Sequence, residues 1–560
     1  MVLLSFNLLL MLGVVSLYQK LVKMSDAQRI EAITRKLVSV KSVNGTGGEV
    51  AIVETVEEIL RSFPIFQMHP EWVWTQKLPG DSLQRKNVFA FINKENATRT
   101  VIYHSHLDTV GIDDFGAIKQ AALNSDELTA YFKNYSADSD IQKDALSGDW
   151  LFGRGALDMK SGDAVNLVNL LYYSEHPEEM SGNLLFMGNC VEENDHSGAI
   201  AALAELEKLK KQQHLSYEVA VNTDFISPKY AGDQQKYIYY GAAGKALTCF
   251  YIKGIETHVG NTYAGIDSTL VASRINTLIN NNPEFVEEIP GEEILPSSCL
   301  LLRDQKDFYN VQTAKVTHLY FNTFTYQRPV YQILQQLKEA VQSDCAELVA
   351  ELIKKQAAYL NKLSFPATED KRQLKVFTFT EYLQSLRQAG VQVEQLMHDF
   401  WEAHADMDKR EVGFALIDYL DKQVNDSTAK VVLFLAPPFC PHNSVAKDSA
   451  VYQKLQATLT AYGQTENFKM KQFFPYLSDS SYLAIDENEE EIGKLAENFP
   501  LAEQIYPLPY AKMRALNIPA VDIGVFGKGA HTWKERVYKP YSFEILPKII
   551  RDFTTKVWKE

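Results

Sequence analysis

Four short stretches of this 560-residue chain carry side chains that could bind metal ions or transfer protons. In chain order these side chains are His106 and Asp108, Asp158, Glu192 and Glu193, and Asp224. Imidazole and carboxylate groups are typical ligands of divalent metal ions, and a carboxylate beside such ions can act as a general base. Most of these stretches follow an apolar run that is typical of a strand. The sequence therefore predicts a metal-dependent hydrolase whose site is built at strand ends.

His106 and Asp108 lie two positions apart, so on an extended strand their side chains share one face. A metal-bound imidazole commonly has its other nitrogen held by a carboxylate, a role that Asp108 can take. His104 is a rival ligand on the same face. The alternative interpretation is a histidine that is merely hydrogen-bonded in the core.

Asp158 lies in a turn that contains Gly153 and Gly155. Glycines allow a tight backbone approach and positive φ, so the turn can present a carboxylate to a crowded site. The turn lacks the further glycine of the dinucleotide motif and the terminal Lys-Ser/Thr of a P-loop. Nucleotide binding is therefore discounted, and a plain turn is the alternative.

Glu192 and Glu193 follow the apolar strand predicted from Asn183 to Met187. Neighbouring side chains diverge at the end of a strand, so one glutamate can bind metal while the other serves as a general base. Adjacent acids on a solvated surface are the alternative. Asp224 follows the predicted strand from Tyr217 to Val221 and is a further candidate ligand, although a turn aspartate would fit the pattern equally well.

Helices and strands alternate from Met24 onward, which predicts an α/β fold with a mixed sheet covered on both faces. In such sheets ligand sites lie beyond the carboxyl ends of strands, where the candidate side chains stand. Residues 24–244 are predicted to form the first part of this domain, and residues 429–560 the second part. Residues 245–428 read as a smaller inserted α/β domain, with a long helix from Val330 to Leu360.

Residues 1–23 form an apolar N-terminal segment. No basic residue precedes its apolar run, and Lys20 and Lys23 follow it, so a retained anchor would leave the body of the protein in the cytoplasm. Met24 is an alternative start, because Ser25 can cap an amphipathic helix that begins there. We expect a cytoplasmic protein and leave a weak membrane anchor open.

The formal charge of −15 argues against a nucleic-acid partner, since phosphate backbones bind basic surfaces. The five cysteines include no Cys-x-x-Cys pair, so neither a disulfide framework nor a thiolate zinc site is indicated. A reducing compartment fits this usage best.

Together the motifs resemble those of the M20 family of co-catalytic metallopeptidases and amidohydrolases. The matching stretches are His106 to Val110, Gly153 to Gly162, Glu192-Glu193, Asp224, and Gly527 to His531. The arginine-utilisation branch of that family is the most similar, through Glu256 to Gly260, Arg303 to Val311, and Phe474 to Tyr482. The likeness extends from about Ser25 to the end of the chain.

The resemblance implies two divalent metal ions, with Zn expected and Mn or Co as alternatives. One ion would be held by His106, Asp158 and Asp224, and the other by Asp158, Glu193 and His531. Asp158 would then bridge the two ions. The inserted domain would serve as a lid and as the surface of a homodimer.

The resemblance also assigns catalytic roles. Glu192 would be the general base and acid, Asp108 would orient His106, and His258 would stabilise the oxyanion. The expected activity is cleavage of an amide or peptide bond in a small amino-acid-derived substrate. One alternative is a hydrolase of esters or carbamates. The other is a non-catalytic binding protein on the same fold. The chain departs from the family pattern after Glu193, where His196 stands in a loop without the usual glycine, and this leaves the role of His196 open.

Overall fold

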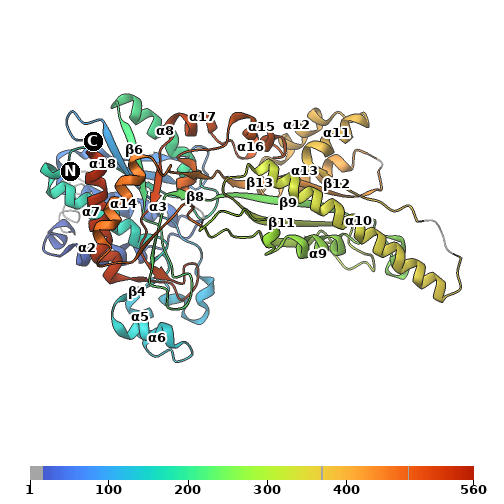
Figure 1. Ribbon diagram of the computed structural model, residues 1–560, viewed down its shortest axis with the longest axis horizontal. Coiled ribbons are helices and arrows are strands. Elements are labelled where there is room, and N and C mark those ends of the chain that lie inside the picture. The colour runs from blue at the N-terminus through green and yellow to red at the C-terminus, as the bar shows by residue number, and fades with distance from the viewer. Residues whose placement is uncertain (1–16, 367–369, 425, 477, 560) are drawn as a thin grey trace, which may run out of the picture. The chain divides into compact units, whose positions relative to one another are not determined.

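The computed structural model describes residues 17–366, 370–424, 426–476 and 478–559. Contacts divide the chain into two compact units, each with its own sheet (Figure 1). The first unit takes in the described residues up to Ala242, the segment Asn443–Ile485 and the described residues from Pro509 onward. The second unit consists of Ala243–His442 and Asp486–Leu508.

An eight-stranded mixed sheet forms the centre of the first unit, in the order β1-β2-β5-β3-β6-β16-β7-β15. Its strands are β1 (Val73–Lys77), β2 (Lys86–Ile92), β3 (Arg99–His106), β5 (Asn183–Asn189), β6 (Ser216–Asn222), β7 (Lys236–Tyr239), β15 (Phe468–Lys471) and β16 (Ala520–Asp522). The central strand β3 is parallel to both of its neighbours, β5 and β6. The carboxyl ends of these three strands therefore meet at one edge of the sheet.

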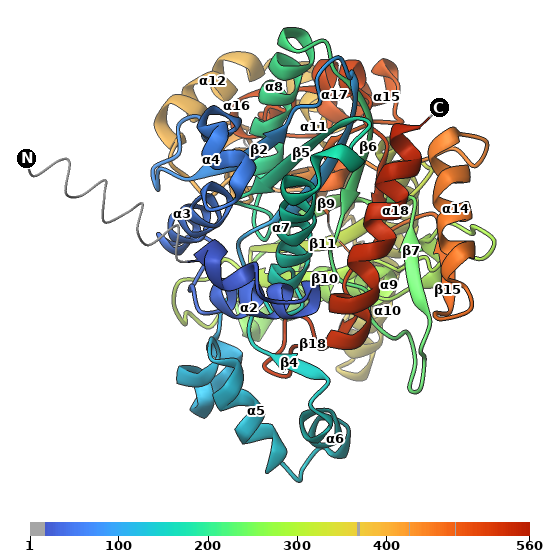
Figure 2. The same cartoon turned by 90° about the vertical axis from the view of Figure 1, so that its left-hand side faces the viewer.

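Helices cover both faces of this sheet, which confirms the predicted α/β fold. They are α2 (Asp26–Val38), α3 (Gly48–Arg61), α4 (Pro64–Met68), α7 (Lys160–Glu175), α8 (Ser197–Gln212), α14 (Ala450–Tyr462), α17 (Tyr510–Leu516) and α18 (Leu546–Trp558). On one face, Val101 and Tyr103 of β3 belong to an apolar core with side chains of α2, α3, α7 and α18, and Figure 2 shows α7 and α18 lying across the strands. On the other face α8 packs against β2 and β5.

Smaller sheets complete the first unit. They are formed by β17 (Gly527–Lys528), β18 (Arg536–Tyr538) and β4 (Trp150–Phe152), and by β14 (Asn443–Ser444) and β8 (Gly241–Ala242). Helices α5 (Ser125–Lys133) and α6 (Ser139–Ser147) form a small apolar cluster around Phe132 with Phe152 and Trp533. The pairing of β18 with β4 brings the segment after His531 beside the segment before Asp158.

A five-stranded sheet forms the centre of the second unit, in the order β10-β11-β9-β13-β12. Its strands are β9 (Gly244–Lys253), β10 (Ser298–Asp304), β11 (Val316–Thr325), β12 (Leu374–Thr378) and β13 (Ala429–Cys440). Its helices are α9 (Ser268–Ile279), α10 (Val330–Lys362), α11 (Phe379–Gln388), α12 (Val393–His404), α13 (Val412–Asp421), α15 (Glu489–Glu497) and α16 (Ala502–Ile505). Helices α9 and α10 share an apolar core with one face of the sheet. On the other face Tyr251 of β9 donates a hydrogen bond to Asp418 of α13.

The two units differ from the sequence-based division at the return to the first unit. The sequence analysis places that return at Ala429, whereas β13 pairs with β9 and β12 inside the second unit. Asp486–Leu508 also belongs to the second unit. Strand β13 is buried along its whole length. A continuous apolar run of this kind indicates a buried strand but does not indicate which of two sheets contains it.

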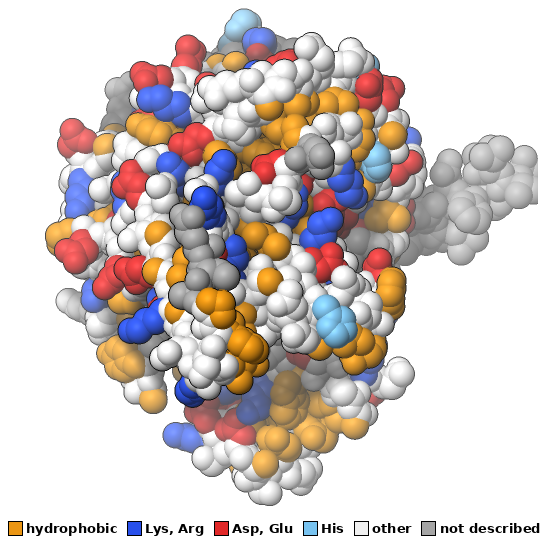
Figure 3. Space-filling model, turned by 90° about the vertical axis from the view of Figure 1, so that its right-hand side faces the viewer, with side chains coloured by type: hydrophobic (Ala, Val, Ile, Leu, Met, Phe, Trp, Pro, Cys, Tyr) orange, Lys and Arg blue, Asp and Glu red, His pale blue; other side chains and the backbone are white. Residues whose placement is uncertain are grey.

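The apolar N-terminal segment lies mostly outside the described residues. In the described part, Leu21 is buried in the core of the first unit, and the Tyr18 hydroxyl donates a hydrogen bond to Glu175 of α7. Within the described ranges, no helix combines the length and the apolar character that crossing a membrane requires. On the face drawn in Figure 3, basic and acidic side chains are interspersed over the described residues.

Gly162, in the first turn of α7, provides a test of how tightly the elements around Asp224 are packed. A Cβ atom added at Gly162 would lie 2.3 Å from the backbone oxygen of Thr223. We expect Gly162→Ala to lower the free energy of unfolding by about 1–3 kcal/mol, because the segment before Asp224 must move. The loss should occur even though alanine favours a helix more than glycine does. Urea unfolding of the variant and the wild type measures this difference in the free energy of unfolding.

Gly47→Ala is the matched control for this measurement, because a Cβ at Gly47 would have no atom within 4 Å. Equal stability of the two variants would contradict the close packing of α7 against the segment that carries Asp224.

Candidate metal centre

The candidate side chains are brought together at the carboxyl edge of the large sheet. His106 is the last residue of β3, Glu192 and Glu193 follow β5, and Asp224 follows β6. Asp158 lies in the turn between β4 and α7. Because β3, β5 and β6 are parallel neighbours, residues separated by more than a hundred positions in the sequence meet at one place.

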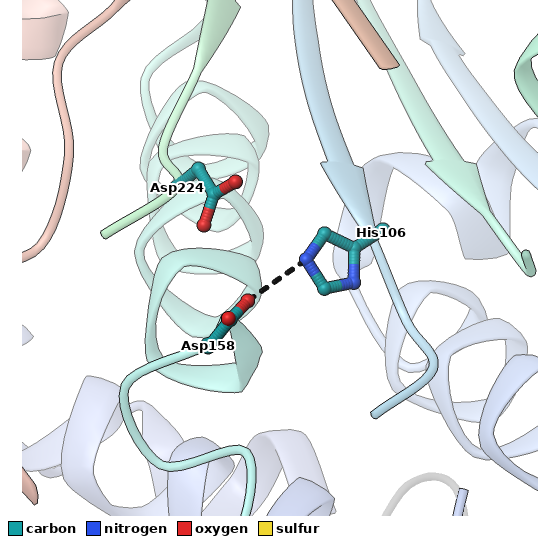
Figure 4. A group of neighbouring side chains, drawn as sticks. All are labelled: His106, Asp158 and Asp224. Atoms are coloured by element: carbon teal, nitrogen blue, oxygen red, sulfur yellow. Dashed lines mark hydrogen bonds and ion pairs between the residues drawn. The ribbon is translucent and has the colours of Figure 1, made fainter. Parts of the chain in front are cut away.

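The first group of possible metal ligands consists of His106, Asp158 and Asp224 (Figure 4). Each residue offers one ligand atom, and these atoms lie within 4.8 Å of one another. The Nε2 atom of His106 is 3.0 Å from Oδ1 of Asp158. All three side chains are buried.

The second group consists of Asp158, Glu193 and His531, again with ligand atoms within 4.8 Å of one another. The Nε2 atom of His531 is 3.0 Å from Oδ2 of Asp158 and 3.1 Å from Oε1 of Glu193. The side chain of His531 is 51% exposed, which leaves one side of this group open to solvent. Asp158 therefore faces one histidine with each of its two oxygens, the arrangement expected of a carboxylate that bridges two ions.

Burial and mutual repulsion make charge costly for the carboxylates of this site. Burial, together with the charge of Asp158, raises the pKa of Asp224 well above its ordinary value. The same two causes raise the pKa of Glu193. Burial alone would raise the pKa of Asp158 as well, but its hydrogen bonds with His106 and His531 lower it.

The two imidazoles respond in the opposite direction. Burial lowers the pKa of His106, but hydrogen bonds with Asp108 and Asp158 outweigh it, and the pKa ends well above its ordinary value. For His531, Asp158 and Glu193 outweigh burial and raise the pKa to about 11. Protons on the imidazoles thus offset the buried negative charge. Divalent cations could replace them, so the donor set fits such ions.

Asp108 fixes the backbone of the acidic pair. Its Oδ1 accepts the N–H of Glu192 at 2.9 Å, and its Oδ2 accepts the N–H of Glu193 at 3.1 Å. The Nδ1 atom of His106 lies 3.2 Å from the Asp108 backbone oxygen and 3.6 Å from its Oδ1. One buried carboxylate therefore contacts both the first histidine and the loop that carries the two glutamates.

Glu192 differs from the other acids of the site. It is 6% exposed, and its Oε1 atom has no hydrogen-bond partner among the described residues. Burial raises its pKa well above the ordinary value. A buried carboxylate is suited to accepting a proton when one of its oxygens accepts no hydrogen bond and its pKa is raised.

A buried polar network lies beside Glu192. The Nδ1 atom of His196 is 3.7 Å from Oε1 of Glu192 and 2.9 Å from Oδ1 of Asp479. Asn189 donates a hydrogen bond to Oδ2 of Asp479 at 2.7 Å and lies 3.2 Å from Nε2 of His104. Burial lowers the pKa of His104 to about 4. His104 and His196 thus lie in this network, and neither is in the two ligand groups described above.

Sequence reasoning did not identify Asp479 as a member of this buried network. The residue lies in the stretch from Phe474 to Tyr482, which the sequence offered only through its resemblance to the arginine-utilisation branch. It lies 283 positions from His196, and nothing in the local pattern indicates that partner.

His258 lies in the second unit, where it precedes the short helix η4 (Val259–Ala264). Its side chain is exposed, and its Nδ1 accepts a hydrogen bond from the N–H of Gly260 at 3.1 Å.

The chain is similar to several known proteins in sequence and in fold. The model of peptidase family M20/M25/M40 matches residues 102–492. The protein RocB of Bacillus subtilis is 46% identical over 544 residues, which cover 96% of each chain. The fold is similar to that of a tripeptidase from Staphylococcus aureus, with a TM-score of 0.53, 14% identity and coverage of 95% of this chain and 99% of that one. A metallo-carboxypeptidase from Sulfolobus solfataricus gives a TM-score of 0.51 at 12% identity, with coverage of 94% and 99%.

The charge of the imidazoles predicts that metal binding releases protons. Without metal the pKa of His531 is about 11, so its imidazole is protonated at pH 7, whereas a metal ligand must be neutral. We therefore expect proton release on binding, and a metal affinity that rises as the pH rises towards 11. Calorimetric titrations in two buffers of different ionisation enthalpy measure the number of protons.

His531→Ala should lower the number of released protons by about one. Identical binding enthalpies in the two buffers would contradict the charged state of the imidazoles.

Proposed function

The chain belongs to peptidase family M20, and we propose that it uses two divalent metal ions to hydrolyse an amide or peptide bond of a small amino-acid-derived substrate. The observation that carries this proposal is Asp158, whose two oxygens face two separate groups of ligand atoms. The buried charge around it supports the same conclusion, because carboxylates packed this closely favour multivalent cations.

In this proposal His106, Asp158 and Asp224 hold one ion, and Asp158, Glu193 and His531 hold the other. Imidazole and carboxylate ligands suit Zn, and they also suit Mn or Co. When bound, such ions polarise a substrate carbonyl and make water more acidic.

Glu192 is the general base of the proposed reaction. Its Oε1, which has no hydrogen-bond partner among the described residues, accepts a proton from the attacking water, and the protonated carboxyl then returns that proton to the leaving nitrogen. Asp108 supports this step, because it holds the Glu192 backbone N–H and lies against His106. His258 is proposed as the donor that stabilises the developing oxyanion, in agreement with the family resemblance.

The substrate class is proposed from the family and from the branch that the chain resembles. An N-acyl amino acid, a dipeptide or an arginine derivative fits the resemblance. We further propose a cytoplasmic homodimer that forms through the second unit.

Metal content tests the proposed ligands directly. Protein purified without chelator should hold close to two metal ions per chain by elemental analysis, and His531→Ala should hold close to one. His176→Ala is the matched control: this histidine forms another group of ligand-type side chains with Glu178 and Glu179, and its loss should leave the count unchanged. A wild-type protein that takes up no Zn or Mn would refute the metal-dependent function.

Glu192→Gln tests the general base. The amide cannot accept a proton, so we expect kcat to fall by a factor of about 10² to 10⁴ while the metal content stays the same. The assay uses a panel of N-acetyl amino acids, including N-acetylarginine, with dipeptides and the matching esters and carbamates. Glu178→Gln changes an exposed glutamate and should keep full activity.

Two outcomes would contradict this assignment. Turnover of Glu192→Gln within tenfold of the wild type would exclude Glu192 as the base. A metal-loaded wild type that cleaves nothing in the panel would favour the non-catalytic alternative, and cleavage of esters alone would favour an esterase.

A further inference from the structure

Arg154 has an extensively hydrogen-bonded guanidinium near the metal centre, and no role in the reaction is assigned to it above. It is 1% exposed. Its Nη1 pairs with Oε2 of Glu535 at 2.8 Å, and its Nη2 pairs with Oδ1 of Asp114 at 2.7 Å. Its Nε donates to the backbone oxygen of Gly111 at 2.9 Å. The ring of Phe115 lies 5.2 Å from the guanidinium carbon. One side chain thus links its own turn to two segments that are distant in the sequence, 111–115 and 532–535.

Glu535 connects this guanidinium to the Asp158 turn. Its Oε1 accepts the backbone N–H of Leu157 at 3.0 Å and that of Asp158 at 3.1 Å. Its Oε2 faces Arg154. The carboxylate is 1% exposed, so water competes little for these bonds. Because the Asp158 backbone is held, the direction in which its carboxylate points is restricted.

The same pair also reaches the segment that carries His531. Thr532 directly follows His531, and its backbone oxygen lies 3.5 Å from Nη1 of Arg154. Glu535 is four residues beyond His531, and its backbone oxygen accepts the N–H of Gly153 at 3.3 Å. Gly111, at the other end of the guanidinium, follows the segment of His106. Three ligand-bearing segments are therefore tied to one ion pair.

Energetic considerations favour a geometric role for this pair. A buried ion pair contributes little net stability compared with an apolar pair of similar size. Hydrogen-bond partners that orient metal ligands, in contrast, typically change metal affinity by a factor of about ten to a hundred. Glu535 does not contact a metal ligand atom in the contacts above; it holds the backbone of the residue that supplies the shared ligand.

We propose that Arg154 and Glu535 are positioning residues, which hold the carboxylate of Asp158 and the segment of His531 at the spacing that a pair of metal ions requires. This inference rests on the proposed metal-dependent function. It adds that metal affinity depends on two side chains that bind no metal themselves.

The test measures metal affinity rather than turnover. Metal-free wild type, Glu535→Gln and Arg154→Lys are titrated by calorimetry with Zn²⁺ or Mn²⁺, whichever the wild type binds. The amide introduced by Glu535→Gln retains an oxygen for the two N–H groups but loses the charge that pairs with Arg154. The ammonium introduced by Arg154→Lys retains the positive charge but cannot make the contacts with Gly111, Asp114 and Glu535 at the same time. We expect the Kd of at least one ion to rise by about tenfold to a hundredfold in each variant.

The matched control is Glu175→Gln, which removes the charged partner of Arg29. That pair is also largely buried, with Nη1 and Oε2 2.8 Å apart, but Glu175 is at the opposite end of α7 from Asp158. We expect its metal Kd to stay within about twofold of the wild type, whatever its unfolding midpoint. Thermal unfolding of each metal-free variant separates stability from affinity.

The possible outcomes distinguish the two proposals. If Glu535→Gln and Arg154→Lys lose stability but bind metal as tightly as Glu175→Gln does, the pair is merely structural and this inference is wrong, while the proposed function stands. If the wild type itself binds no metal, both proposals are wrong. Should Glu535→Gln fail to fold, Arg154→Lys decides the question alone.

Discussion

The crowding of buried acids at one edge of the large sheet is the constraint on which the rest of the site depends. Asp158, Glu193 and Asp224 lie close enough to raise one another's cost of ionisation, and burial removes the water that would normally screen them. Two imidazoles offset part of this charge when protonated. In our proposal two divalent cations offset it instead. The surrounding structure must therefore hold like charges together, which explains why so many hydrogen bonds nearby end on the backbone of the ligand-bearing segments.

Topology supplies this restraint. Parallel pairing of β3 with β5 and β6 fixes the starting points of three loops at one edge, and pairing of β18 with β4 fixes two more segments beside them. The strand pairing does not fix the backbone conformation of the loops that follow the strands. Asp108 restrains the loop of the acidic pair by accepting the backbone N–H groups of both glutamates. Glu535 restrains the Asp158 turn in the same way, through the N–H groups of Leu157 and Asp158. Asp108 and Glu535 are thus buried carboxylates that hold the backbone on which other carboxylates stand. Asp108 holds the backbone of Glu193, and Glu535 holds the backbone of Asp158.

Much of the fold and several candidate ligands could be predicted from the sequence, because their signals are local, whereas His531 and the division of the ligands into two groups came from the family resemblance. The apolar run from Asn183 to Met187 predicts β5, and ligand-type residues at the ends of such runs predict where the metal groups form. Partners that are distant in the sequence give no such signal. Glu535 lies 377 positions from the Asp158 N–H that it accepts, and within the sequence it is one more charged residue between Lys534 and Arg536. The sequence analysis places strand β13 in the other domain for a related reason, since an apolar run does not specify its sheet.

The contacts around Glu192 show how one site can contain acids with different tasks. Asp108 accepts two backbone N–H groups, and Asp479 accepts a hydrogen bond from Asn189 and lies within hydrogen-bond distance of His196. Asp158 faces both histidines of the ligand groups. Each of these carboxylates already has hydrogen-bond or imidazole partners. Oε1 of Glu192 has no hydrogen-bond partner among the described residues, and burial favours its neutral form. We therefore propose Glu192, rather than these partnered carboxylates, as the group that takes a proton from water.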